Sequence, residues 1–94
     1  MSNYIITQYS YDQAKILNLI IKQSKHKAKK IDVYDIHNNF LHSIGDIKYN
    51  DYTTYLSTYN KEYANERKRL YHIRHQKNIN IVNSKQYLSA NLLW

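Results

Sequence analysis

The sequence contains no cysteine and no proline, and glycine occurs only once. Without cysteine the chain can form neither a disulfide framework nor a thiolate zinc site, and it has no cysteine nucleophile. A single glycine excludes the glycine-rich loops that cradle phosphates in nucleotide-binding folds. These absences remove most common catalytic chemistries, so we expect a protein that is not an enzyme and that holds no cofactor and no metal.

Long apolar runs are also absent. The longest run, over residues 16–21, is far shorter than the ~20 residues that a membrane span needs. The first residues lack the basic region, apolar stretch and small-residue cleavage site of a signal peptide. We therefore expect no membrane span, no secretion by a signal peptide, and a location inside a cell or packed inside a particle.

The residues that are present favour a folded chain with a positive surface. Hydrophobic residues make up 43% of the 94 residues and 11 residues are tyrosine, which argues against disorder. A chain of this length has room for one small domain, residues 1–94. The formal net charge is +7. A charge of that sign predicts an anionic partner, which is a nucleic acid or an acidic protein.

The positive charge is divided between two segments, the first and second basic clusters. Residues 22–30 hold five lysines and no acid, a net +5, and residues 61–77 hold six cations against two glutamates, a net +4. Residues 31–60 between them hold four aspartates and one lysine, a net −3. The two clusters therefore lie on either side of an acidic middle segment.

The same middle segment predicts a small antiparallel sheet and an α+β fold. Residues 31–36 alternate with the period of a half-buried strand, and residues 40–44 return as its hairpin partner. Residues 37–39 (HNN) between them suit a turn, because asparagine tolerates a positive φ. Residues 16–23 fit one face of a helix or of a strand. We predict a strand, because the apolar period stops after residue 23. Residues 1–14 are expected to be an extra strand or an N-terminal extension.

Helices are predicted in the second half of the chain. Apolar and tyrosine side chains recur at spacings of three to four over residues 51–77, Asn50 or Asp51 can cap the first turn, and Asn60 can divide the helix into two. Ser84 predicts the start of a short helix over residues 84–93. The fold expected is therefore about three strands followed by one long or broken helix and one short helix.

The basic clusters supply the candidate anion-binding residues. Lysines act as point charges and predict attraction to phosphates without base recognition. The alternative for the first cluster is a flexible loop, and for the second a solvated helix face whose arginines anchor Asp46 or Asp51. The candidates are Lys25, Lys27, Lys29, Lys30, Arg67, Lys68, Arg69, Arg74 and Lys77.

Histidine, aspartate and tyrosine side chains are the other candidates for catalysis, metal binding or protein contacts. His72 and His75 have a metal-compatible spacing but no carboxylate one turn away, and the four aspartates are typical of caps and turns. The tyrosines at positions 49, 52, 55, 59 and 63 recur at helical spacing, which favours a role in the core or in a protein interface over stacking on nucleic-acid bases. The candidate interface residues are Tyr59, Tyr87, Leu93 and Trp94.

Several short motifs occur in an order that resembles a family of small basic proteins of giant DNA viruses. They are residues 24–34 (SKHKAKKIDVY), 44–46 (IGD), 49–53 (YNDYT), 67–71 (RKRLY), 74–75 (RH), 88–89 (LS) and 92–94 (LLW). The resemblance implies strand, basic loop, strand and then helices, and it implies no activity. Residues 1–14 have no counterpart in the pattern, and residues 81–84 replace a glycine-rich segment.

Two functions follow as hypotheses. The first is a non-enzymatic viral protein, carried in the virion, whose basic clusters contact nucleic-acid phosphates. The alternative is a minor capsid or cementing protein that binds other, acidic viral proteins through tyrosine-rich and C-terminal apolar surfaces. The oligomeric state, and whether the partner is DNA, RNA or protein, are not determined by the sequence.

Overall fold

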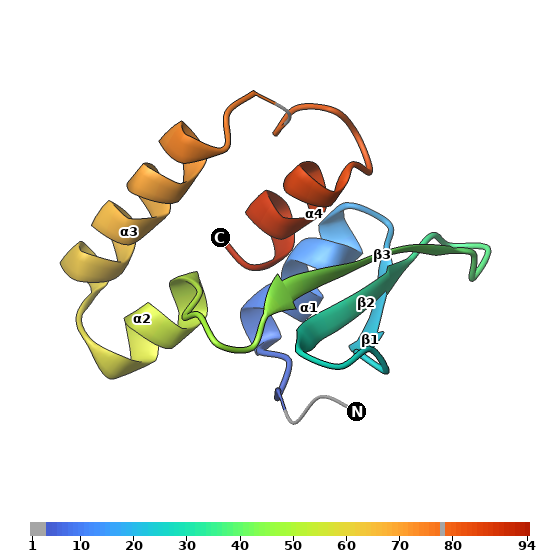
Figure 1. Ribbon diagram of the computed structural model, residues 1–94, viewed down its shortest axis with the longest axis horizontal. Coiled ribbons are helices and arrows are strands. Elements are labelled where there is room, and N and C mark those ends of the chain that lie inside the picture. The colour runs from blue at the N-terminus through green and yellow to red at the C-terminus, as the bar shows by residue number, and fades with distance from the viewer. Residues whose placement is uncertain (1–3, 78) are drawn as a thin grey trace. The chain divides into compact units, whose positions relative to one another are not determined.

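The structure, a computed structural model, describes residues 4–77 and 79–94. Its elements are α1 (Gln8–Ile16), β1 (Ile20–Gln23), β2 (Lys29–Tyr34), β3 (Phe40–Asp46), α2 (Tyr52–Thr58), α3 (Lys61–Arg74) and α4 (Lys85–Leu92) (Figure 1). A three-stranded antiparallel sheet is followed by helices, which confirms the predicted α+β class. None of the helices in this described part of the chain has the length and apolar character of a membrane span.

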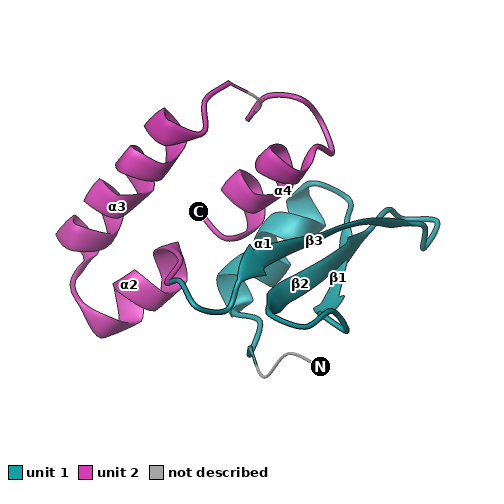
Figure 2. Cartoon of the chain, in the orientation of Figure 1, with its two compact units in different colours: residues 1–49 teal, residues 50–94 magenta. Residues whose placement is uncertain are grey.

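The chain divides into two compact units (Figure 2). Unit 1 comprises residues 1–49 with α1 and the sheet, and unit 2 comprises residues 50–94 with the other three helices. The expectation of one small domain over residues 1–94 stays a prediction.

The N-terminal part of unit 1 differs from the sequence-based expectation. Residues 8–16 form α1, which begins after Thr7, whose hydroxyl accepts a hydrogen bond from the Ser10 amide at 3.4 Å. The helix ends because Asn18 adopts a left-handed conformation with φ of 58°, and the Leu19 amide then donates to the Ala14 carbonyl at 2.8 Å. The strand predicted from residue 16 therefore starts only at Ile20.

One face of the sheet carries apolar side chains that are buried. Ile21 pairs with Val33, and Ile31 pairs with Ile44, so all four side chains project from the same face. Each of the four is buried. The alternation of Ile31 and Val33 therefore reports a real apolar face, but the strand runs over residues 29–34 and not over the predicted residues 31–36.

The opposite face, called the polar face below, carries charged and hydroxyl side chains. Lys22 pairs with Asp32, and Asp32 pairs with Ser43, so these three residues lie across the three strands on one side. Lys30 and Tyr34 belong to the same face, because they alternate with the buried Ile31 and Val33 along β2.

A β-bulge in β3 changes which side chains reach the polar face. Val33 pairs with His42, whereas the next residue, Tyr34, pairs with Phe40, so Leu41 is the extra residue. An extra residue moves the side chains beyond it to the other face. Phe40 consequently lies beside Tyr34 on the polar face, with their ring centroids 5.7 Å apart.

Each helix of unit 2 begins at a capping side chain. Asp51, Asn60 and Ser84 accept hydrogen bonds from backbone amides in the first turns of α2, α3 and α4. The long helix predicted over residues 51–77 is therefore divided at Asn60, as that residue indicated, and it ends at Arg74. The predicted cap at Ser84 is confirmed.

The cap of α2 gives the first testable prediction. Asp51 is 1% exposed, and its Oδ1 accepts hydrogen bonds from the Thr54 amide at 3.0 Å and from the Thr53 hydroxyl at 2.9 Å. Replacing Asp51 by Ala leaves these donors unpaired, so we expect unfolding free energy to fall by about 1–2 kcal/mol. Thermal unfolding followed by circular dichroism measures the loss.

The matched control is Asp51→Ser, which keeps a capping oxygen and should recover most of that stability. An alanine variant that unfolds at the native temperature would show that this cap does not limit the stability of unit 2.

Candidate anion-binding surface

A buried aspartate organises the loop that contains the first basic cluster. Asp32 is 2% exposed, and it accepts hydrogen bonds from the Ser24 hydroxyl at 2.7 Å and from the Lys25 amide at 3.1 Å. The Ser43 hydroxyl of β3 donates to the same carboxylate. Ser24 Oγ in turn accepts from the His26 amide at 3.0 Å. Residues 24–28, the basic loop, are therefore tied to the sheet at their start.

These hydrogen bonds also set the ionisation of Asp32. Burial by itself would raise the pKa of the carboxyl, but the hydrogen bonds from Ser24, Ser43 and the Lys25 amide outweigh it, and the positive field of His26 adds to them. The pKa is therefore below its usual value, and Asp32 remains a carboxylate throughout the neutral range.

The far end of the basic loop is fixed by backbone contacts. Ala28 has a positive φ of 68°, and its carbonyl accepts a hydrogen bond from the Ile47 amide at 3.0 Å. The Lys29 amide donates to the His26 carbonyl at 3.3 Å. The interpretation of this segment as a flexible loop is not supported, because both of its ends are hydrogen-bonded to the sheet or to itself.

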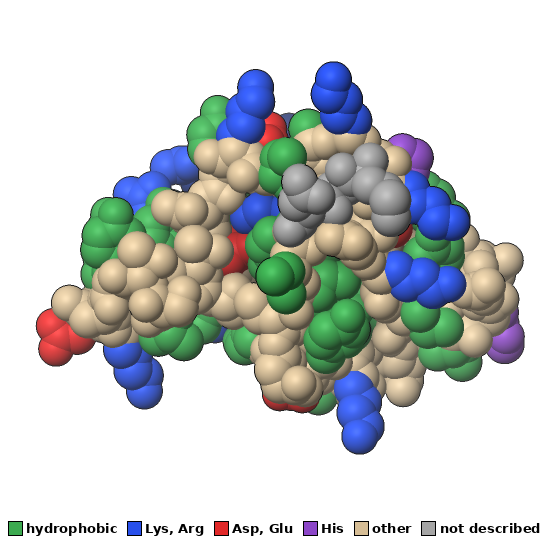
Figure 3. Space-filling view, turned by 90° about the horizontal axis from the view of Figure 1, so that it is seen from below, with side chains coloured by type: hydrophobic (Ala, Val, Ile, Leu, Met, Phe, Trp, Pro, Cys, Tyr) green, Lys and Arg blue, Asp and Glu red, His purple; other side chains and the backbone are tan. Residues whose placement is uncertain are grey.

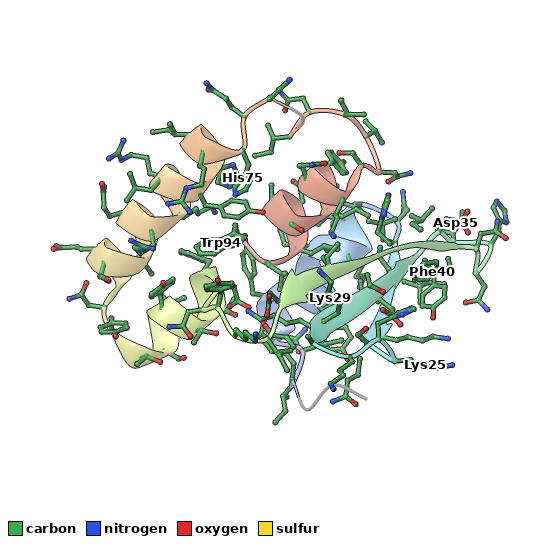
Figure 4. The ribbon with its side chains drawn as sticks, in the orientation of Figure 1. Lys25, Lys29, Asp35, Phe40, His75 and Trp94 are labelled. Carbon is green, nitrogen blue, oxygen red and sulfur yellow. The ribbon has the colours of Figure 1, made fainter. Side chains whose placement is uncertain are left out.

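Lys25 and Lys27 extend from this fixed loop into solvent. Both are exposed, and neither has a carboxylate partner within residues 4–77 and 79–94. Figure 4 shows Lys25 projecting outward at the edge of unit 1, and in Figure 3 individual Lys and Arg side chains project in several directions beyond the surrounding surface. Two of the nine predicted cations therefore have the exposure that phosphate contact needs.

The other two candidates of the first cluster are less accessible. Lys30 is 4% exposed, its Nζ donates to the Tyr49 carbonyl at 2.7 Å, and it lies 5.1 Å from the centroid of the Tyr4 ring. Its ammonium is thus part of the interior of unit 1 and is not placed to meet a phosphate. Lys29 is half-buried at the start of β2.

In the second cluster, three of the five candidates interact within unit 2. The Arg67 guanidinium lies 5.4 Å from the Tyr55 ring centroid. The Lys68 ammonium lies 4.8 Å from the Tyr52 ring centroid. Contacts of this kind hold a cation against an aromatic face.

The third of these cations, Arg69, forms an ion pair with Glu66 one turn earlier, with its Nε donating to Oε2 at 3.0 Å. The Glu66 carboxylate partly offsets the charge that Arg69 presents to an external anion.

Arg74 and Lys77 at the end of α3 resemble Lys25 and Lys27 in their exposure. Both are exposed and have no carboxylate partner in the described residues. The freely exposed candidates are therefore Lys25 and Lys27 in unit 1, and Arg74 and Lys77 in unit 2.

An aromatic cluster occupies the interior of unit 2. The Tyr71 ring stacks on Trp94, with centroids 4.5 Å apart and planes 8° apart, and lies 4.3 Å from the His75 ring centroid. Burial raises the pKa of Tyr71, and a hydrogen bond with Ser89 opposes it. Figure 4 shows His75 and Trp94 on the two segments that meet at this cluster. Tyr71 and His75 are therefore engaged with each other rather than free to stack on a base.

His72 belongs to the same region of unit 2. Burial lowers its pKa, a hydrogen bond with a backbone oxygen of Trp94 opposes this, and the charge of Lys68 adds to the lowering. The imidazole is therefore neutral in the neutral range. Among the described residues, no group of three or more His, Asp or Glu side chains is arranged to hold a metal ion.

The residues proposed as protein-interface anchors differ in accessibility. Leu93 is 2% exposed, and its carbonyl accepts a hydrogen bond from the Tyr52 amide at 3.0 Å, so its side chain does not lie on a surface. Trp94 and Tyr87 are half-buried. Tyr59 is 57% exposed and contacts Tyr63 with ring centroids 4.7 Å apart. Tyr59 is the anchor candidate with an open side chain.

The four aspartates of the middle segment carry structural hydrogen bonds, as their turn and cap chemistry indicated. Asp35 accepts from the His37 and Asn39 amides, both at 2.9 Å, and Asp46 accepts from the Lys48 amide at 2.9 Å. These bonds to amides lower the pKa of Asp35, together with the side-chain hydrogen bond from Asn39. With Asp32 and Asp51 they shape the backbone on which the lysines are displayed.

Sequence reasoning missed a second part of the site, which lies on the polar face beside the basic loop. The His26 and Phe40 rings have centroids 5.7 Å apart, and the Lys22 ammonium lies 5.0 Å from the Tyr34 ring centroid. Phe40 is 50% exposed. The signal in the sequence was the position of Phe40 directly after the predicted turn. The bulge that places Phe40 on the polar face produces no pattern in the sequence.

No family model, curated protein or solved structure matches this chain. The resemblance to small basic proteins of giant DNA viruses therefore stays a prediction, and the function is argued from the side chains alone.

Proposed function

We propose that this chain is a small, non-enzymatic basic protein that docks on nucleic-acid phosphates without reading sequence. Following the resemblance of its motifs, the proposal places it in a giant virus, inside the host cell and carried in the virion. The observation that carries the proposal is the pair of exposed, unpaired lysines, Lys25 and Lys27, on a loop that buried Asp32 fixes.

The charge distribution supports phosphate contact over base recognition. Lysine ammonium groups attract phosphate oxygens from many directions, whereas base recognition uses planar forks such as an unpaired arginine. Of the arginines in the second cluster, Arg67 is held over an aromatic ring and Arg69 is paired with Glu66. Arg74 is exposed and, in the described part of the chain, has no carboxylate partner.

The dependence of affinity on salt tests this function. Four phosphate contacts, from Lys25, Lys27, Arg74 and Lys77, would give a slope of log affinity against log salt of about −3 to −4. Between 50 and 200 mM salt, affinity for a labelled duplex or single strand would then fall by about a hundredfold. Fluorescence anisotropy at several salt concentrations measures the slope.

A matched pair of double variants separates local contacts from net charge. Lys25→Gln with Lys27→Gln should reduce the magnitude of the slope by about 1.5–2. Lys15→Gln with Lys48→Gln removes the same charge from exposed positions outside both basic clusters and should leave the slope near native. Equal slopes for the two pairs, or affinity no higher than that of a lysine-rich peptide of charge +7, would overturn the proposal.

A structural or cementing role is the second candidate, and one observation favours it. Tyr59 and Tyr63 form an aromatic pair in which the two side chains are 57% and 38% exposed. Paired, half-open tyrosines are enriched where proteins contact one another. Tyr59→Ser with Tyr63→Ser should abolish co-sedimentation with an acidic capsid component if this role holds, and should leave nucleic-acid affinity unchanged.

A further inference from the structure

The polar face of the sheet brings four side chains from four segments into one patch beside the basic loop. Lys22 comes from β1, Tyr34 from β2, Phe40 from β3 and His26 from the loop itself. The four side chains contact one another in turn. The Lys22 ammonium lies over the Tyr34 ring, the Tyr34 and Phe40 rings pack edge to face with an interplanar angle of 71°, and the Phe40 ring contacts the His26 ring. We call this set the aromatic patch.

The position of Phe40 is the unusual feature of this patch. The bulge at Leu41 turns the Phe40 side chain away from the apolar face, and half of its surface stays open to solvent. A phenyl ring gains nothing from water, and bulges are found where a strand must re-aim a side chain next to a functional site. The arrangement therefore leaves an aromatic face open on the outside of unit 1.

The charges around the ring define what can cover it. Lys22, Lys25 and Lys27 are exposed on β1 and the adjoining loop, and none of them has a carboxylate partner in the described chain. Two acids lie near these lysines. Asp32, on the same face, is buried and accepts hydrogen bonds from Ser24, Ser43 and the Lys25 amide, and Asp35 accepts from Asn39 and the His37 amide. Figure 4 shows Lys25 and Phe40 at the same end of unit 1, with Asp35 beyond Phe40 at the hairpin tip.

We propose that the aromatic patch is a stacking platform for an unpaired base of single-stranded nucleic acid, with the strand's phosphates held by Lys22 and Lys25. This inference rests on the proposed function and names its substrate class. An unpaired base offers a flat aromatic surface to Phe40 and an adjacent negative charge to the lysines. A duplex keeps its bases stacked inside and can offer the phosphates alone. Single strands therefore satisfy both halves of the patch.

Stacking predicts a difference between strands that carry the same phosphates. The probes are a labelled twelve-nucleotide oligothymidine, an abasic strand of the same length and a twelve-base-pair duplex, each titrated with the full chain. Oligothymidine should bind about tenfold more tightly than the abasic strand, because one base–ring stack is added. Phe40→Leu should remove that advantage and leave abasic and duplex binding at native levels.

Two further variants make the test decisive. Phe40→Trp supplies a larger ring at the same position and should keep or increase the preference for oligothymidine. Leu41→Ala alters the bulge residue without altering the ring, and serves as a control for general disturbance of β3. Unchanged thermal unfolding of each variant shows that its effect concerns binding rather than folding.

The outcomes separate this inference from the function on which it rests. Equal binding of oligothymidine and the abasic strand, with a steep salt slope, would overturn the stacking platform and leave phosphate docking in place. A Phe40→Leu variant that weakens all three probes equally would overturn it as well. If no probe shows salt-dependent binding, phosphate docking itself fails. Displacement of oligothymidine by polyglutamate at equal charge concentration would assign the patch to acidic protein.

Discussion

Replacing Asp32 by Ala is expected to cost about 3 kcal/mol of unfolding free energy. The carboxylate is buried and receives hydrogen bonds from Ser24, Ser43 and the Lys25 amide. A hydrogen bond to a charged group contributes about 1.5–3 kcal/mol, and the three are coupled, so their loss is less than their sum. For a chain of this size the midpoint of thermal unfolding should fall by about 12–20 °C.

Asp35 provides the matched control, because its carboxylate also accepts three hydrogen bonds but does so in the exposed hairpin tip. Water can replace lost partners there, so Asp35→Ala should cost no more than about 1 kcal/mol. Limited trypsin digestion gives a second measurement, since Lys25 and Lys27 should be cleaved faster once the basic loop is released. An Asp32→Ala variant as stable and as resistant as Asp35→Ala would contradict this account of the loop.

The stabilisation by Asp32 also has a defined pH dependence. Its folded-state pKa is lowered, so the unfolded chain binds the proton more readily, and the contribution of Asp32 is complete above its unfolded pKa of about 3.8. It is lost as the pH falls from there through the lower folded-state pKa. The difference in stability between the native chain and Asp32→Ala should accordingly narrow below pH 3.8 and stay constant from pH 5 to 7.

The second large effect is expected from Trp94. Its ring stacks on Tyr71 and lies 6.0 Å from the Tyr55 ring centroid, within the aromatic cluster of unit 2. Truncating a buried tryptophan costs about 3–5 kcal/mol, and Trp94 is half-buried, so Trp94→Ala should cost about 2–3 kcal/mol. Urea unfolding followed by circular dichroism measures this, because the variant lacks the single tryptophan that fluorescence would report.

This variant also distinguishes a packing role from the role of an interface anchor. Trp94→Phe keeps a ring against Tyr71 and should recover more than half of the loss. Tyr59→Ala, at an exposed ring of the same unit, should change stability by no more than about 0.5 kcal/mol. If the Trp94→Ala chain has the same urea midpoint as the native chain, Trp94 does not stabilise unit 2, and the predicted role as an interface anchor is favoured instead.

Local signals in the sequence predicted the elements whose causes are local. Asp51, Asn60 and Ser84 cap the helices that they were expected to cap, and Asn38 takes a positive φ of 67° in the hairpin turn. Helix α1 was missed because its buried residues, Ser10 and Ala14, are small and give no apolar stripe in the sequence. Only the left-handed conformation of Asn18 separates the helix from the strand that follows.

The candidate site was harder to predict because it depends on contacts between residues that are far apart in the sequence. Lys30 looked like its neighbours in the basic cluster, yet the polar face of β2 places its ammonium against the Tyr49 carbonyl and the Tyr4 ring. The register that brings Ser43 to Asp32, and the bulge that brings Phe40 to Tyr34, leave no periodic trace. Charge counting predicted an anionic partner and nine candidate cations, but it could not separate the exposed cations from those that are buried or held by other side chains.

The anchoring of residues 24–28 has a consequence for how fast a complex would form and dissociate. A loop that becomes ordered on binding loses backbone entropy at that moment, whereas this one is already held at both ends. Only the lysine side chains remain to be immobilised, at about 0.5–1.5 kcal/mol each. If the proposed docking on phosphates holds, ordering of this loop should therefore not slow association, and the loop's backbone should add little entropic cost to the affinity.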